Sequence, residues 1–191
     1  NDVYSATVQM LTYESLYQYK FLGDVTTLEP ALATDFPKYS KDGKTLTITL
    51  KQGVHFQDDP CFKETGGKGR EVVAQDFVNF FKLAAAKKFL SPMYINYEGI
   101  VEGIDDYRNE KTKEISGVKA LDKYTIEIKT LKKRPRFINN FVSRYAPMIP
   151  LECVEYYGDE LAHHAVGTGP FIIKKYSTTK AEAIKNPTYR E

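Results

Sequence analysis

The fold is most legible in the stretch Asp42-Gly43-Lys44-Thr45-Leu46-Thr47-Ile48-Thr49-Leu50-Lys51-Gln52-Gly53-Val54-His55-Phe56, which contains a turn, a strand and a second turn. Asp42-Gly43 favours a tight hairpin turn, because glycine adopts positive φ at little cost. From Thr45 to Leu50 polar and apolar residues alternate strictly, which predicts a β-strand with one apolar face. We therefore expect a hairpin that pairs residues 36–40 with residues 45–51.

Similar patterns predict the other elements. An apolar stripe at helical spacing predicts a helix over residues 71–90; its members are Val73, Phe77, Phe80, Phe81 and Ala84. A second hairpin is expected between residues 118–121 and 124–131, and a final strand at 171–176. Shorter helices are expected within 8–20, 104–108, 135–144 and 151–157. Hairpins and helices interleave, so the sequence predicts an α+β fold, α/β in the wider sense.

Composition excludes several classes of protein. The chain has 191 residues, 42% of them hydrophobic and 27% charged, which suits one large domain or two small ones. The net charge of +2 gives no global field for nucleic acid. The densest basic run contains Lys129, Lys132, Lys133, Arg134 and Arg136. No set of aromatic residues for stacking bases accompanies it, so we interpret it as a solvated turn and expect no nucleic-acid partner.

Cys61 and Cys153 fit neither a zinc pattern nor a CxxC redox motif. They could form one long-range disulfide or stay as two buried thiols, and of these the sequence favours free thiols. No apolar run approaches the ~18 residues of a membrane span. The chain begins at Asn1 without an apolar leader and ends at Glu191 just after a turn. We expect it to be a processed or cut piece of something longer.

The sequence contains no convincing catalytic or metal-binding set. The histidines are His55, His163 and His164, and none stands at a known spacing from a cysteine. Adjacent histidines on a helix point to different sides, so His163 and His164 with nearby acids make poor chelators. The glycine-rich segments 66–69 and 167–170 match neither phosphate-binding pattern and are interpreted as turns. We expect no cofactor and no metal. The absence of a catalytic set favours a binding protein.

Several ordered segments together resemble one family. Leu28–Ala33, Asp42–Thr45, Lys51–Phe56 and Ala74–Val78 resemble the successive motifs E-P-x-L-A, D-G-K, G-[VA]-x-[FW] and T-A-x-D of the family 5 extracellular solute-binding proteins. Further along, 117–126, 166–171 and 186–189 resemble the family's G-V…D-x-[YH]-T, G-T-G-P-[FY] and N-P-x-Y segments. Val73 stands where the family has a helix-capping threonine. This family comprises the oligopeptide- and dipeptide-binding components of ABC importers.

The resemblance implies part of a type II periplasmic binding protein, in which two lobes close on a ligand. Residues 1–35 would belong to the main subdomain of the first lobe, 36–164 would form its hairpin-rich small subdomain, and 165–191 would return to the main subdomain. The second lobe would be absent. By position in the family, Tyr94, Asn96 and Tyr97 would lie near the ligand cleft, as would Tyr13 and Glu14. Packing between subdomains is the competing explanation for all five residues.

The function implied by the resemblance is capture of a peptide or related small solute for import, without catalysis. The expected partners are that ligand and a membrane ABC permease. The expected state is a monomer, located in the periplasm or otherwise outside the cytoplasm, with a lipid anchor as one form of attachment. Two alternatives remain: a Cys-dependent hydrolase that uses Cys61 or Cys153 with a histidine, and a standalone interaction domain.

Overall fold

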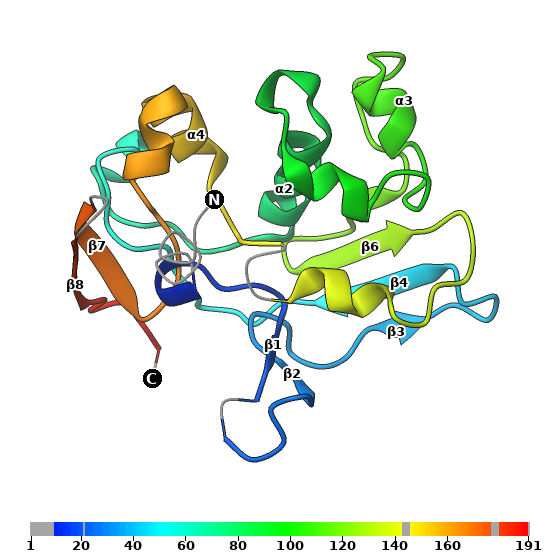
Figure 1. Ribbon diagram of the computed structural model, residues 1–191, viewed down its shortest axis with the longest axis horizontal. Helices are drawn as coiled ribbons and strands as arrows, with labels where there is room; N and C mark the ends of the chain where they lie inside the picture. The colour runs from blue at the N-terminus through cyan, green and yellow to red at the C-terminus, as the bar shows by residue number, and fades with distance from the viewer. Residues whose placement is uncertain (1–9, 21, 143–145, 177–179, 191) are drawn as a thin grey trace.

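The computed structural model describes residues 10–20, 22–142, 146–176 and 180–190 (Figure 1). In this part of the chain all strand pairs are antiparallel and form three sheets, with orders β1-β2, β3-β4-β6-β5 and β7-β8. The strands are β1 (Tyr17–Tyr19), β2 (Leu28–Pro30), β3 (Lys38–Tyr39), β4 (Thr45–Thr49), β5 (Val118–Ala120), β6 (Thr125–Lys129), β7 (Phe171–Tyr176) and β8 (Ala181–Lys185). The α-helices are α2 (Ala74–Ala85), α3 (Ile104–Arg108) and α4 (Leu151–Tyr157). Short 3₁₀-helices are η1 (Lys63–Thr65), η2 (Lys87–Phe89), η3 (Pro92–Asn96), η4 (Phe137–Phe141) and η6 (Gly158–His163).

The four-stranded sheet joins the two predicted hairpins and confirms both. β4 pairs with β6 in a register that sets Leu46 opposite Ile128 and Ile48 opposite Ile126. All four side chains are buried, because period-2 alternation puts them on the same face of the sheet. Helix α2 packs against this sheet through β5 and β6. Figure 1 shows the sheet at the opposite end of the molecule from β7 and β8.

Helix α2 is shorter than predicted. Residue Val72 donates its backbone N–H to the carbonyl of Val54, so the chain is still paired in extended form just before the helix. Val73 is the N-cap and lacks a side-chain cap, but the Asp76 carboxylate accepts a hydrogen bond from its N–H at 2.9 Å. An acid in the first turn thus stabilises the N-terminus in place of the family's threonine. At the other end Ala86 is extended, and the helix stops before Ser91-Pro92.

An aromatic cluster fills the space beneath α2. Phe77 and Phe81 from the helix meet Phe141 from η4 edge to face, with ring centroids 5.4 and 6.3 Å apart. Tyr97, which follows η3, packs on Phe81 at 4.7 Å. Edge-to-face pairs of buried rings stabilise a core beyond the area that they bury. The cluster therefore fixes η3 and η4 against the helix.

The N-terminal prediction was partly wrong. A helix was expected within residues 8–20, but only Met10–Thr12 are helical and Tyr17–Tyr19 form β1. Pairing with β2 satisfies the backbone groups of this segment, and that long-range pairing overrides the local spacing of Tyr13, Leu16 and Tyr17. Residues 8 and 9 lie outside the described part of the chain.

At the C-terminal side the strand at 171–176 is confirmed as β7, but β8 was not predicted. Its sequence, Ala-Glu-Ala-Ile-Lys, has a weak alternation and low β-propensity. The short helix at 151–157 is confirmed and ends at Gly158. The helix expected at 135–144 is the 3₁₀-helix η4, and residues 143–145 are outside the described part.

The expectation of free thiols was wrong. Cys61 and Cys153 form a disulfide across 92 positions of sequence, with Cα atoms 4.9 Å apart. It ties the loop of residues 57–70 to helix α4. Only the tertiary fold brings these residues together, since neither cysteine lies in a motif that names its partner.

The Glu71 carboxylate joins its own segment to two others, one at Gly53 and one at Lys123 and Tyr124. It accepts hydrogen bonds from the backbone N–H of Gly53 at 2.5 Å, from Lys123 Nζ at 2.7 Å and from Tyr124 Oη at 2.9 Å. These bonds favour the ionised form, with the contact to Lys123 contributing most, and they lower the pKa of Glu71 to about 2. Glu71 therefore links the turn after β4 to the turn between β5 and β6.

We expect Glu71→Gln to flatten the acid dependence of stability. A native pKa of about 2 lies below the ordinary value of 4.5, so the stabilisation is complete above pH 4.5 and is lost as the pH falls toward 2. Urea unfolding at several values between pH 6 and pH 2.5 should show a steeper loss for the wild type than for Glu71→Gln. Glu64→Gln, on an exposed side chain, is the control and should keep the wild-type slope. Equal slopes for wild type and Glu71→Gln would contradict the assignment.

Candidate functional site

The first predicted pair, Tyr13 and Glu14, lies between the helical turn at Met10–Thr12 and β1. The Glu14 carboxylate is held by two hydrogen bonds from Arg190, of 2.7 and 2.5 Å. The backbone carbonyl of Glu14 accepts a hydrogen bond from the N–H of Met148. Burial raises the pKa of Tyr13 to about 12, so its hydroxyl is neutral and able to donate at neutral pH. Glu14 is thus already engaged by the chain, and the Tyr13 hydroxyl contacts the backbone of Val166.

Gly167 and Gly169 let the chain pass close to this pair. A Cβ at Gly167 would lie 2.1 Å from the carbonyl oxygen of Thr12, and one at Gly169 would lie 2.6 Å from that of Leu11. Gly169 donates its N–H to the Thr12 carbonyl at 2.8 Å. Glycine is needed at both positions because the backbone of residues 11 and 12 comes so close. This packing role agrees with the interpretation of the segment as a turn.

Three buried oxygens at this junction have no hydrogen-bond partner. They are Thr12 Oγ1, Gln57 Oε1 and Thr168 Oγ1, on side chains at most 4% exposed. Gln57 reaches the same loop, since its N–H donates to Gly167 and its Nε2 to Ala165. A buried oxygen without a partner costs about 1–3 kcal/mol. A polar ligand or an ordered water would therefore gain hydrogen bonds here, at residues that the sequence did not single out.

The second predicted set, Tyr94, Asn96 and Tyr97, lies on η3 and directly after it. Tyr94 Oη donates to Asp105 Oδ1 at 2.6 Å, and burial together with this carboxylate raises its pKa. Tyr97 is fully buried, its hydroxyl donates to the backbone of Asn140, and burial raises its pKa. Tyr97 has no surface of its own to offer a ligand. The structure thus brings these three together, but their contacts are separate from those of Tyr13 and Glu14.

Asn96 opens onto a depression of about 590 Å³, which we call the η3 depression. Its floor includes the half-buried Ile100 and the buried Phe137. The Asn140 side chain donates to the backbone oxygen of Asn96 at 3.0 Å and so joins η4 to η3. The remaining lining residues are Ile95, Lys133, Arg134, Pro135 and Arg136.

Sequence reasoning missed an ionic cluster at Arg70. Its guanidinium donates to the buried Asp76 through Nη2 at 2.6 Å and Nη1 at 2.9 Å, and to Glu152 through Nε and Nη2. Burial disfavours the charge of Arg70, but the hydrogen bonds to Asp76 and Glu152 more than offset this, and its pKa is raised. The hydrogen bond from Arg70 lowers the pKa of Glu152. Only Asp76, an acid in a predicted first helical turn, could have been suspected from the sequence.

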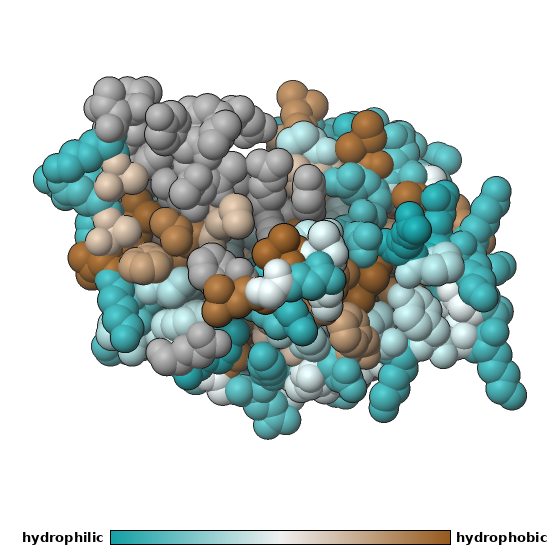
Figure 2. Space-filling model, turned by 60° about the horizontal axis from the view of Figure 1, so that its bottom comes forward, coloured by the Kyte–Doolittle hydropathy of each residue, from teal (hydrophilic) through white to brown (hydrophobic). Residues whose placement is uncertain are grey.

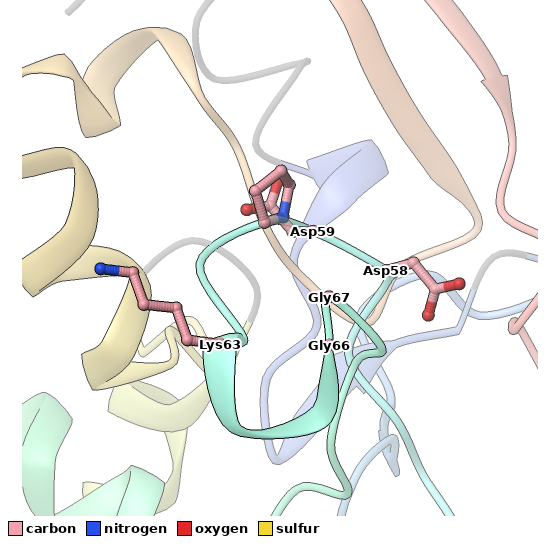
Figure 3. A pocket seen from close by; sticks show the side chains of 6 residues that line it. Asp58, Asp59, Lys63, Gly66 and Gly67 are labelled. Atoms are coloured by element: carbon pink, nitrogen blue, oxygen red, sulfur yellow. The ribbon is translucent and has the colours of Figure 1, made fainter.

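The loop of residues 57–70 lines a second pocket, which is open to solvent and has a volume of about 510 Å³ (Figure 3). Figure 3 shows Asp58 and Lys63 pointing away from each other on opposite sides of the loop. Asp58 forms an ion pair with Lys68 at 2.6 Å, and Asp59 Oδ1 accepts from Tyr157 Oη at 2.9 Å. The charged groups of this pocket therefore do not converge on one point.

The described residues offer one group that resembles a metal-binding set. Ligand atoms of Asp59, Cys61 and Cys153 lie within 4.8 Å of one another. The two sulfur atoms are bonded to each other, so they carry no thiolate for a metal. Of the two adjacent histidines, which the sequence predicts to be poor chelators, His164 stacks on Tyr157 with ring centroids 4.3 Å apart. The side chain of His163 is outside the described part of the structure.

Comparison with known proteins gives a consistent result. Residues 27–191 match the family described as bacterial extracellular solute-binding proteins, family 5 Middle. The oligopeptide-binding protein SarA of Streptococcus gordonii is 36% identical over 172 residues, and AmiA of Streptococcus pneumoniae is likewise 36% identical over 172 residues. Each match covers 85% of this chain, and it covers 24% of SarA and 25% of AmiA.

The fold is also found in solved structures. OppA of Listeria monocytogenes, bound to peptide, superimposes with a TM-score of 0.80 at 23% identity. The match covers 100% of this chain and 36% of that one. Likeness at this identity shows the fold: part of a type II periplasmic binding protein, as the sequence predicted.

These matches place the chain in one class of proteins, the extracellular solute-binding proteins. The chain belongs to the bacterial extracellular solute-binding proteins of family 5. It spans about a quarter of the length of the curated relatives that it matches. Within the described residues, no helix is both long enough and apolar enough to cross a membrane.

We expect Arg70→Met to destabilise the fold by about 3 kcal/mol, because it leaves the Asp76 carboxylate buried without its cationic partner. Asp76 is only 1% exposed, so water cannot replace the lost bonds. Urea unfolding at pH 7 measures the change.

Lys68→Met removes the surface ion pair with Asp58 and is the matched control, with an expected cost of about 0–1 kcal/mol. Similar losses for the two variants would show that the Arg70 cluster is no more than a surface network.

Proposed function

We propose that the chain is part of the first lobe of the substrate-binding component of an ABC importer that captures peptides. The observation that carries this proposal is the match of residues 27–191 to a family of solute-binding proteins. The oligopeptide-binding names of SarA and AmiA, and the peptide in the OppA structure, support peptide as the ligand class.

The proposed organisation keeps the predicted boundaries. Residues 36–164 would be the small subdomain, which contains the four-stranded sheet, α2 and the aromatic cluster. Residues 1–35 and 165–191 would belong to the main subdomain. Hydrogen bonds between Thr12 and Gly169 and between Glu14 and Arg190 support their association.

The mechanism we propose is capture by closure of two lobes, without chemistry. Peptide-binding sites commonly hold an extended backbone through main-chain hydrogen bonds. Tyr13 is the residue among the five predicted ones that best suits a ligand contact, because its hydroxyl is neutral and it directly follows Thr12, one of three residues whose buried oxygens lack partners. Asn96 is half-buried and open to solvent. Glu14, Tyr94 and Tyr97 would act by supporting these neighbours.

The whole protein would act at a membrane. Its partner would be a membrane ABC permease, its state a monomer, and its location the periplasm or the outer face of the membrane. A lipid anchor would be one form of attachment.

Neither alternative function gains support from a specific observation. A Cys-dependent hydrolase needs a free thiolate, and Cys61 and Cys153 are bonded to each other. A standalone domain would need a ligand site complete within this chain, and the open pockets described above have no converging set of polar groups around an enclosed cavity.

Native mass spectrometry of the full-length protein tests the ligand class. We expect the protein as purified to carry a series of peptide masses that exchange with an added peptide mixture. A single non-peptide ligand, or saturable peptide binding by the 191-residue chain as tight as that of the full-length protein, would contradict the proposal.

Tyr13→Phe in the full-length protein tests the residue assignment. Losing one hydrogen bond should weaken peptide binding about tenfold, as measured by calorimetry. Tyr19→Phe, on a tyrosine that is 47% exposed in β1, should leave the affinity unchanged. An unchanged affinity for Tyr13→Phe would restrict Tyr13 to a packing role.

A further inference from the structure

The η3 depression has an electrostatic character that the peptide-binding proposal does not use. Its lining contains three cationic side chains, of Lys133, Arg134 and Arg136, and no carboxylate. All three residues are exposed, and no ion pair to a carboxylate is found for them among the described residues. By contrast Lys129, in the same basic run, is neutralised by Glu102 at 2.8 Å. The basic run therefore contains one lysine paired with a carboxylate and three cations at the η3 depression for which the described residues provide no carboxylate partner.

The fold holds these cations in place. Lys133 lies across the turn of the first hairpin, where a Cβ at Gly43 would come within 3.0 Å of its side-chain carbons. Gly43 has φ +68°, so glycine suits the position both for backbone conformation and for this contact. Phe137, buried two positions beyond Pro135, anchors the other end of the basic segment in the aromatic cluster.

One exposed aliphatic side chain lines the η3 depression, and the backbone of a second exposed residue is hydrogen-bonded to its lining. Ile95, in the lining, is 74% exposed. Leu131 is 48% exposed, and its N–H donates to the backbone of Ile100 in the lining at 2.8 Å. Large apolar side chains beside unpaired cations suit a surface that has both negative charge and hydrocarbon. Figure 2 shows one face of the molecule, where the side chains that project from the end with the four-stranded sheet are mainly hydrophilic and apolar side chains form scattered patches.

We propose that the η3 depression is a docking site for anionic phospholipid headgroups, with Lys133, Arg134 and Arg136 binding the phosphate and Ile95 and Leu131 entering the interface. Arginine pairs well with phosphate oxygens, because its planar guanidinium donates two parallel hydrogen bonds. An acidic segment without apolar residues would satisfy the cations but would leave the aliphatic side chains in water. A lipid surface accommodates both, and it would orient the small subdomain against the membrane.

Vesicle flotation tests the proposal with the 191-residue chain and with the full-length protein carrying no lipid anchor. We expect binding to vesicles that contain phosphatidylglycerol and little binding to pure phosphatidylcholine. The triple variant Lys133→Gln, Arg134→Gln, Arg136→Gln should lower the partition coefficient about 100-fold, since each cation near an anionic surface adds roughly a factor of five. Ile95→Ser should lower it severalfold while leaving the net charge unchanged.

The matched control is Lys113→Gln, Lys119→Gln, Lys174→Gln, which removes the same charge from exposed lysines elsewhere. It should keep most of the binding, and circular dichroism should show all variants folded. Equal losses in the two triple variants would reduce the effect to net charge and overturn the proposal. So would equal binding to neutral vesicles, or tight binding of inorganic phosphate or a polyglutamate peptide with no vesicle binding. If the triple variant does not fold, Ile95→Ser and Arg134→Gln decide the question by the same readout.

Discussion

The pairing of β4 with β6 is the interaction on which the small subdomain depends. It joins segments about 80 positions apart in the chain, and its register puts Leu46, Ile48, Ile126 and Ile128 on one buried face. A slip of one residue would turn this face to water, so the hydrophobic effect fixes the register strongly. Helix α2 packs on the sheet, and the aromatic rings beneath α2 then place η3 and η4. The η3 depression, formed between these short helices, is thus a consequence of the strand register.

The other end of the molecule is organised by polar and covalent contacts. The disulfide between Cys61 and Cys153 and the contact of Arg70 with Glu152 both fix helix α4 to the segment that leads into α2. Asp76 serves two purposes, since its carboxylate stabilises the start of α2 and binds Arg70. One change at Arg70 therefore affects the helix terminus, the loop and α4 together. Long-range bonds of this kind compensate for the absence of a large sheet at this end.

Peptide capture and membrane docking would use different parts of the chain. The junction of Thr12, Tyr13 and Thr168 holds buried oxygens without partners and a neutral hydroxyl, which suits a polar ligand. The η3 depression holds cations and aliphatic side chains in solvent. Asn96 lies in the lining of the depression and was also expected near the ligand, so the variants that test docking leave it intact.

Local patterns in the sequence determined both hairpins, helix α2, α3 and α4, because strict alternation and an apolar stripe leave one arrangement that buries the apolar face. Ordered motifs also determined the family. The tertiary structure decided what depends on contacts between distant segments. It placed Tyr17–Tyr19 in a strand through pairing with β2, joined the two cysteines, and brought Glu152 to Arg70. It also put Tyr97 in the core and left Asn96 at the surface, since a 3₁₀-helix can present neighbouring residues to opposite environments. Local periodicity determined the two central hairpins and the main helix, whereas the terminal strands and the sites depend on which distant residues meet.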